Sequence, residues 1–246
     1  MKQLIAILLT TTAVLVTLNS SAQLTIQFPS KDGLTLTAQW YPVNESMPVI
    51  LLCHQNRFSR GEYTETALKL NKFGFNCLAI DQRVGDEING VKNQTARLAK
   101  KQGMNPTFLD AEQDIQASID YLYEKYGKPV IVMGSSYSAS LALKLSNHNP
   151  KVLGVVAFSP GEYFSDKTYI RKSMSGFDKP LLAISSKAES SSVKSLISDA
   201  GSVLKIQYVP KNAGEHGSKV LWSSFKGNEE YWIVLMNFLD KLRFLD

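Results

Sequence analysis

The sequence predicts an α/β fold: a mostly parallel sheet of about eight strands with helices on both faces. Short apolar segments alternate with helix-like segments along nearly the whole chain after residue 22, an order typical of parallel sheets. Two apolar runs, 49–53 and 130–133, are continuously hydrophobic, as in strands that are buried on both faces. The composition, 44% apolar and 20% charged, shifts nowhere along the 246 residues, so residues 23–246 are expected to form one domain.

Turn residues and helix-end residues mark the boundaries between these segments. Lys31-Asp32-Gly33 separates two short apolar segments and predicts an opening hairpin. Thr107 followed by Asp110 fits a helix start, and Gly127 fits the end of that helix. The expected strands cover residues 24–28, 34–40, 49–53, 76–81, 130–133, 152–158, 181–185 and 204–209. The expected helices cover 65–73, 109–126, 139–145, 192–198 and 229–242, and a long polar segment fills 82–105.

The first 22 residues have the pattern of a secretory signal peptide. Lys2 gives a positive start, residues 4–18 are apolar with threonines, and Ser20-Ser21-Ala22 offers small residues for cleavage. A membrane-spanning helix is the alternative, but the apolar stretch is shorter than the ~20 residues that a span needs. Cleavage after Ala22 would leave an exported protein, secreted or periplasmic, with no stable membrane anchor.

The cysteines and the charge narrow the function classes. Cys53 would end one strand and Cys77 would begin the next, so two parallel neighbours would hold them too far apart for a disulfide, and two buried free thiols are expected. Neither cysteine has the spacing of a zinc or redox motif. The net charge of +5 comes from scattered basic residues, apart from a cluster at 97–101, and this favours a solvated surface over nucleic-acid binding.

The most specific pattern is Gly134-Ser135-Ser136-Tyr137-Ser138, which lies between the apolar run 130–133 and a helix-like stretch. A serine at a tight strand-to-helix turn projects its hydroxyl out of the sheet, where it can act as a nucleophile. Ser136 is therefore the candidate nucleophile. Ser138 stands where this pattern usually has its second glycine.

An acid and a base follow at the ends of later strands. Glu189 comes just after the seventh predicted strand and His216 just after the eighth, and the carboxyl ends of parallel strands meet at one edge of a sheet. The order Ser136, Glu189, His216 is that of a catalytic triad, in which the histidine takes the serine proton and the carboxylate orients the histidine. Glu162 is the alternative acid, and Asp178 is a further carboxylate in the same part of the chain.

Two backbone N–H groups are expected to bind the negatively charged oxygen that forms during such a reaction. One is that of Tyr137, directly after the nucleophile, and the other is that of Asn56, in the loop after the third strand. His54 opens the same loop and is assigned no catalytic role.

These motifs together resemble the α/β-hydrolase superfamily, in particular its compact dienelactone-hydrolase-like and esterase-like members. Cys53-His54-Gln55-Asn56 is similar to the family's strand that ends in His-Gly-x, and Ala79-Ile80-Asp81-Gln82-Arg83-Val84-Gly85 is similar to its D-x-R-G-x-G segment. Gln55, Val84 and Ser138 each replace a family glycine. A cysteine nucleophile, as in dienelactone hydrolases proper, is absent, so the resemblance to those enzymes is in fold more than in reaction.

The triad and the resemblance imply a serine hydrolase. Esters of small soluble molecules are the expected substrates, because residues 159–180 are too few for a large cap domain and the 82–105 segment is polar. An amidase or peptidase with the same triad, or a catalytically silent binding protein with this fold, are the alternatives. The sequence contains no phosphate loop, metal cluster or dinucleotide fingerprint, so no cofactor or metal is expected. It leaves the oligomeric state open.

Overall fold

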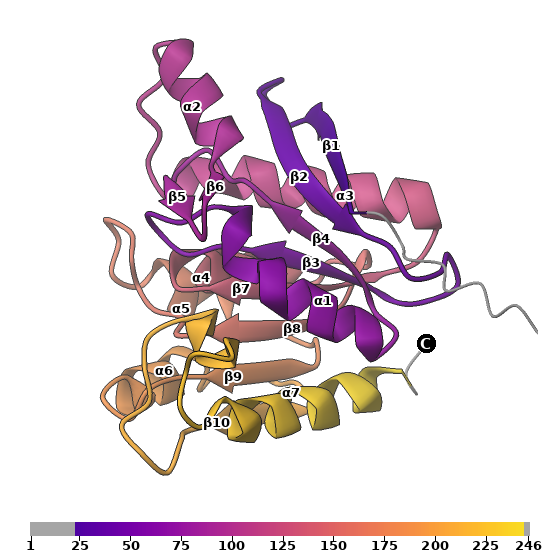
Figure 1. Ribbon diagram of the computed structural model, residues 1–246. Coiled ribbons are helices and arrows are strands. Elements are labelled where there is room, and N and C mark those ends of the chain that lie inside the picture. Colours follow the sequence, from indigo (N-terminus) through magenta and orange to yellow (C-terminus); the bar gives the residue numbers. More distant parts are fainter. Residues whose placement is uncertain (1–22, 244–246) are drawn as a thin grey trace, which may run out of the picture.

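The computed structural model describes residues 23–243, which are organised around one eight-stranded sheet (Figure 1). The strand order is β1-β2-β4-β3-β7-β8-β9-β10, with β2 antiparallel to β1 and β4 and every other neighbouring pair parallel. The strands are β1 (Leu24–Pro29), β2 (Thr35–Tyr41), β3 (Val49–Cys53), β4 (Asn76–Ile80), β7 (Val130–Ser135), β8 (Val152–Phe158), β9 (Leu181–Ile184) and β10 (Lys205–Tyr208). The predicted α/β fold and its eight strands are confirmed.

Helices cover both faces of the sheet, as predicted. In Figure 1, α1 (Thr64–Lys72) and α7 (Asn228–Leu242) lie in front of the sheet, and α3 (Glu112–Tyr126) lies behind it. The helices α4 (Tyr137–Ser146), α5 (Tyr169–Ser173) and α6 (Ser190–Leu196) pack into the same hydrophobic cluster as α3. Short 3-10 turns complete the structure at Arg60–Tyr63, Leu109–Ala111 and Ser218–Leu221.

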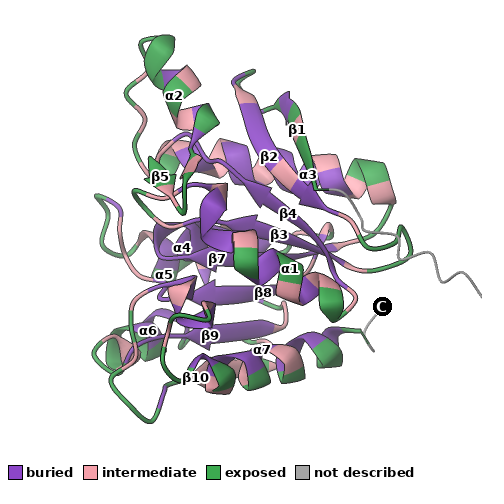
Figure 2. Cartoon of the chain, in the orientation of Figure 1, coloured by how far each residue is buried: buried purple, intermediate pink, exposed green. Residues whose placement is uncertain are grey.

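The central strands form the core because their side chains alternate between the two helical layers. Leu51 and Cys53 belong to the cluster with α3 and α4, whereas Ile50 and Leu52 belong to the cluster with α1 and α7. All five residues of β3 are buried, which explains the continuously apolar sequence, and Figure 2 shows the central strands as buried along their length.

The polar segment at 82–105 is more ordered than its sequence suggested. It contains a short hairpin, β5 (Glu87–Ile88) with β6 (Val91–Lys92), followed by α2 (Gln94–Lys101). The helix begins at Asn93, whose side chain accepts a hydrogen bond from the Ala96 N–H at 2.8 Å. Polar side chains dominate this segment, so hydrophobic periodicity gave no signal for it.

Both cysteines are buried and free, as expected. Cys53 pairs with Ile80 and Cys77 pairs with Ile50, so the two thiols lie three register positions apart along neighbouring parallel strands. The predicted signal peptide, residues 1–22, lies outside the described residues. No helix within residues 23–243 is both long and apolar enough to cross a membrane.

Candidate active site

The predicted nucleophile lies on a sharp turn between β7 and α4. Ser136 adopts φ 61° and ψ −126°, a conformation that a residue with a side chain rarely takes, and its N–H donates to the Phe158 carbonyl at 2.8 Å. Gly134 makes the turn possible, because a Cβ there would lie 2.7 Å from backbone atoms of Ala139. The strand and the helix can therefore approach closely, and the turn presents Ser136 as the α/β-hydrolase pattern predicts.

Ser138, which replaces the second glycine of the pattern, has a structural role of its own. Its side chain is fully buried, and its hydroxyl donates to the His54 carbonyl at 2.5 Å and accepts from the Gln82 side-chain amide. The serine thus ties the start of α4 to the loops that follow β3 and β4. This contact explains how the turn persists without the glycine.

The structure brings the predicted base and acid together. His216 Nδ1 lies 2.5 Å from Glu189 Oε1, and both side chains are partly exposed. The other carboxylate oxygen, Oε2, accepts hydrogen bonds from the Ser186 N–H at 3.0 Å, from the Ser186 hydroxyl at 2.8 Å and from the Ser159 hydroxyl at 2.8 Å. Burial alone would raise the pKa of Glu189, but the hydrogen bonds from His216, Ser186 and Ser159 outweigh it and lower that pKa to about 2. Glu189 is therefore ionised at neutral pH and can orient the imidazole.

The two other carboxylates lie elsewhere. Glu162 accepts hydrogen bonds from the N–H groups of Ile170 and Arg171, at 2.9 and 2.8 Å, and so caps the first turn of α5. Asp178 is exposed and lies 3.8 Å from His148, which is also exposed. The geometry therefore favours Glu189 over Glu162 as the acid partner of His216.

Two neighbours of the triad residues were not predicted from the sequence. The Ser159 hydroxyl donates to Glu189 and accepts from the Gly217 N–H at 3.0 Å, so it connects the acid to the histidine loop. The Tyr163 ring lies 6.3 Å from the His216 ring, centroid to centroid, in an edge-on arrangement, and its hydroxyl donates to the Ser159 carbonyl at 2.7 Å. Burial raises the pKa of Tyr163 to about 12, and the Ser136 side chain acts in the opposite direction and lowers it.

The predicted oxyanion donor Asn56 lies in a tight turn after β3. The Phe58 N–H donates to the Gln55 carbonyl at 3.3 Å, and Arg57 has φ 63°, the positive angle expected at the third position of a type II turn. Asn56 is exposed, and within residues 23–243 its N–H has no hydrogen-bond partner. Tyr137 is the first residue of α4, so its own N–H has no partner inside the helix.

His54 holds this turn in place through hydrogen bonds of its ring. Its Nε2 accepts from the Gln82 N–H at 3.1 Å, so the proton lies on Nδ1, which donates to the Gln55 carbonyl at 2.8 Å. Burial is the main cause that lowers the pKa of His54 to about 4, and the ring is therefore neutral. It positions backbone rather than taking part in proton transfer.

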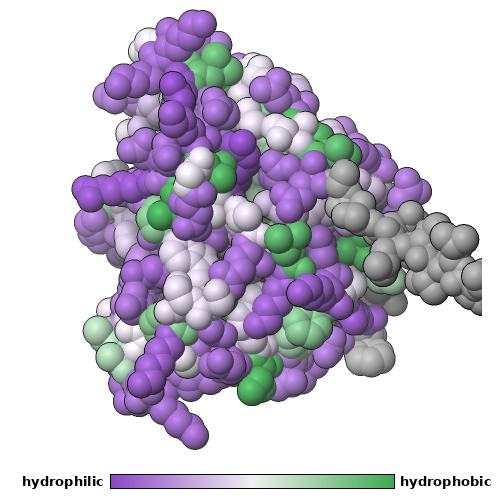
Figure 3. Space-filling model, viewed as in Figure 1, coloured by the Kyte–Doolittle hydropathy of each residue, from purple (hydrophilic) through white to green (hydrophobic). Residues whose placement is uncertain are grey.

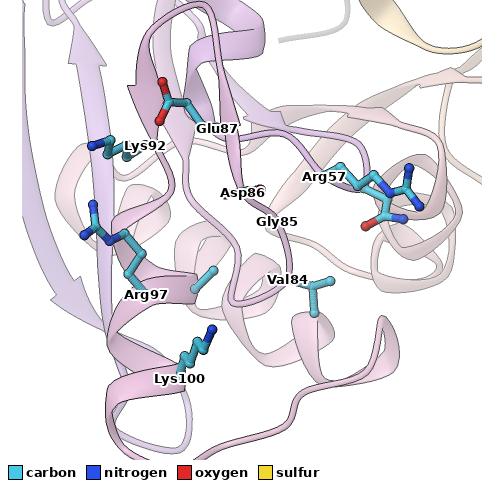
Figure 4. A pocket seen from close by; sticks show the side chains of 10 residues that line it. Arg57, Val84, Gly85, Asp86, Glu87, Lys92, Arg97 and Lys100 are labelled. Atoms are coloured by element: carbon cyan, nitrogen blue, oxygen red, sulfur yellow. The ribbon is translucent and has the colours of Figure 1, made fainter.

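An open cleft of about 820 Å³ borders Asn56 (Figure 4). Arg57 lies on one side of it, and Lys92, Arg97 and Lys100 lie on the other. The lining residues come from the turn after β3 and from the 82–105 segment, so the β5–β6 hairpin and α2 form a wall of this cleft. Asn56 connects it to the candidate site, whereas Ser136, Glu189 and His216 do not line it. Its charged side chains suit polar molecules.

The sheet order, the turn at Ser136 and the contact between His216 and Glu189 define the α/β-hydrolase class. The chain belongs to the serine aminopeptidase family S33, whose family model matches residues 44–230. It is therefore a hydrolase of the α/β-hydrolase superfamily.

Solved structures share the fold at low sequence identity. An esterase from Pyrococcus furiosus, Pf2001, is 19% identical with a TM-score of 0.71 and covers 90% of this chain and 93% of its own. A dienelactone hydrolase from Anabaena variabilis is 13% identical with a TM-score of 0.69, covering 89% of this chain and 97% of its own. An acylaminoacyl peptidase from Pyrococcus horikoshii is 17% identical with a TM-score of 0.62, and the match covers 89% of this chain but 41% of the peptidase. No curated protein matches the chain.

Proposed function

We propose that this chain is an exported serine hydrolase that cleaves carboxylic esters of small soluble molecules through an acyl-enzyme on Ser136. The observation that carries the proposal is the 2.5 Å contact between His216 Nδ1 and Glu189, at the same sheet edge as the turn that presents Ser136. An ionised carboxylate on Nδ1 leaves Nε2 of the imidazole free to accept the serine proton.

In the proposed reaction, Ser136 Oγ attacks the ester carbonyl while His216 takes its proton. The N–H groups of Tyr137 and Asn56 stabilise the oxyanion of the tetrahedral intermediate, which on release of the alcohol leaves an acyl group on Ser136. His216 gives its proton to the departing alcohol, then activates a water molecule that hydrolyses the acyl-enzyme.

The shape and lining of the cleft support small polar substrates. It is open and lined by Arg57, Lys92, Arg97, Lys100 and acidic neighbours, with few apolar side chains to hold a long acyl chain. The segment between β8 and β9 carries only the short helix α5, which agrees with the absence of a large cap there.

Amide or peptide hydrolysis is the second candidate. The family is described as a serine aminopeptidase family, and one similar structure is an acylaminoacyl peptidase. The same triad attacks an amide carbonyl, so the substrate assay includes short esters, lactones, aminoacyl amides and N-acyl peptides.

Labelling with a fluorophosphonate probe tests the nucleophile and the base. We expect the wild type to be labelled on Ser136, located by mass spectrometry, and the Ser136→Ala and His216→Ala variants to lose labelling. His148→Asn is the matched control, because His148 is an exposed histidine with φ 51°, a conformation that asparagine tolerates. Labelling that persists in Ser136→Ala would exclude the proposed nucleophile, and a folded wild type that is never labelled would favour a silent binding protein.

Export has its own test. The proposal expects the mature protein in the periplasm or the medium with Gln23 as its first residue, read by N-terminal sequencing. A protein that keeps residues 1–22 and stays in the membrane fraction would contradict it.

A further inference from the structure

Glu62 is a buried carboxyl group that the proposed reaction does not use. Its side chain is fully buried in the 3-10 turn Arg60–Tyr63, and within residues 23–243 it forms no ion pair with a lysine or arginine. The neighbouring Arg60 is directed to Asp81 instead. Buried carboxylates are costly and are normally paired with a cation, so this one calls for an explanation.

The carboxyl group joins the two loops that carry the predicted oxyanion donor and the predicted base. Its Oε2 accepts from the Gln55 N–H at 2.7 Å, and Gln55 directly precedes Asn56. Its Oε1 accepts from the Ser218 hydroxyl at 2.6 Å, and Ser218 is two residues after His216. One side chain therefore fixes the relative position of both loops.

Further contacts strengthen the same junction. The Ser135 hydroxyl, next to the nucleophile, accepts from the Ser218 N–H at 2.9 Å and donates to the Gln55 side-chain oxygen at 3.3 Å. Gly217 packs so closely that a Cβ there would lie 2.1 Å from that same oxygen. The oxyanion turn, the nucleophile turn and the histidine loop thus meet around Glu62.

We propose that ionised Glu62 is a positioning residue, which holds the Asn56 turn and the His216 loop together and favours the positively charged imidazolium of the transition state. The inference rests on the proposed function, because it needs His216 to act as the base. An ionised carboxylate accepts both hydrogen bonds at full strength, whereas a protonated one has a hydroxyl where one of the two donors now points. Within residues 23–243, Glu62 is the carboxylate that accepts hydrogen bonds from both loops, whereas Glu189 contacts the imidazole itself.

Other titratable groups face Glu62 from the adjoining elements. Tyr63, Cys53 and Tyr137 lie on the adjoining elements, and burial raises the pKa of each well above neutrality. Burial likewise raises the pKa of Glu62 to about 7, although hydrogen bonds from Ser218 and Gln55 and the charge of His216 act in the opposite direction. A proton on Glu62 therefore opposes catalysis on the acid side.

The test compares the rate of fluorophosphonate labelling between pH 5 and pH 9 in the wild type, Glu62→Gln and Glu65→Gln. Glu65 is the matched control: it also accepts from a backbone N–H and a serine hydroxyl, both of Ser223, but it is exposed. We expect the wild-type rate to fall more steeply toward acid pH than the Glu62→Gln rate, because only the wild type gains a proton on this carboxyl group. At alkaline pH, Glu62→Gln should lower the rate about 10- to 100-fold, as is typical for residues that orient an active group.

Two further variants keep the inference testable if Glu62→Gln folds poorly. Glu62→Asp keeps the charge and should retain the steep limb, and Ser218→Ala removes one donor and should move the limb to higher pH. A Glu62→Gln variant that is labelled as fast as the wild type, or whose rate falls as steeply toward acid pH, would overturn the inference. If the wild type is not labelled at all, the proposed function fails. If Ser136 is labelled and the Glu62 variants behave like the wild type, the inference about Glu62 fails while the proposed function stands.

Discussion

Glu62→Gln should make the protein more stable at alkaline pH while making it less active. The substitution keeps the size of the side chain and one hydrogen-bond acceptor but removes the charge. Glu62 is fully buried, so solvent does not screen that charge, and the folded protein bears the full cost of holding it.

The magnitude follows from the pKa of Glu62, which burial raises from 4.5 to about 7. Below pH 4.5 the group is protonated in the folded and unfolded chains alike, and it does not affect folding. Between pH 4.5 and 7 the unfolded chain ionises while the folded one holds its proton, so the free energy of unfolding declines as the pH rises. Above pH 7 both are ionised and the loss is complete, about 3 kcal/mol at ~1.4 kcal/mol per pKa unit.

Urea denaturation at pH 5 and pH 8 measures this effect. We expect the free energy of unfolding of Glu62→Gln, relative to the wild type, to rise by about 3 kcal/mol between the two pH values. Glu65→Gln should show a difference from the wild type that hardly changes with pH, because that side chain is exposed. If the difference in the free energy of unfolding between Glu62→Gln and the wild type does not change with pH, the Glu62 carboxyl group is not ionised at a cost in stability. Glu62 would then be no more than a structural contact.

Three other outcomes follow from the site. Glu189→Gln should lower turnover about 10³- to 10⁴-fold, as loss of a triad carboxylate does. Glu162→Gln, at the start of α5, should keep the wild-type turnover. Equal losses in the two variants would contradict the assignment of the acid. Ser138→Gly should lower the free energy of unfolding by about 1–3 kcal/mol, because the Gln82 amide and the His54 carbonyl lose a buried partner. Urea denaturation measures this, and an unchanged midpoint of unfolding would show that these contacts do not stabilise the protein. Among p-nitrophenyl esters, kcat/KM should be higher for acetate and butyrate than for palmitate, because the cleft is open and polar, and the reverse order would contradict a small soluble substrate.

Much of the fold could be predicted because its signals are local. The runs 49–53 and 130–133 are apolar throughout, since both faces of those strands are covered by helices. The candidate triad followed from the same strands, because the carboxyl ends of parallel strands meet at one edge and each of its residues directly follows a strand. The position after β9 and the order of the three residues favoured Glu189 as the acid, with Glu162 left as the alternative, and the structure places Glu189 against His216.

Glu62 could not be identified in this way, because its role depends on partners that are distant in sequence. Ser218, which donates to it, is 156 positions away, and nothing in either local sequence links the two. In the structure the Glu62 carboxylate accepts from the Gln55 N–H at 2.7 Å, in the turn that follows β3.

The three replaced glycines have to be judged with their partners. Ser138 is tolerated because its hydroxyl has two buried partners, and Val84 is followed by Gly85, which has φ 158° and no room for a Cβ beside Phe58, Asn93 and His54. Gln55 is tolerated because residue 217 is a glycine. A side chain at position 217 would collide with the side-chain oxygen of Gln55. In the family pattern, a glycine follows the histidine after β3 and lets the neighbouring backbone approach closely. Here Gly217, directly after His216, provides that space instead. Because the Gln55 side chain also contacts Ser135 and its N–H reaches Glu62, the substitution that looked like a departure from the family is part of the junction that holds the candidate site together.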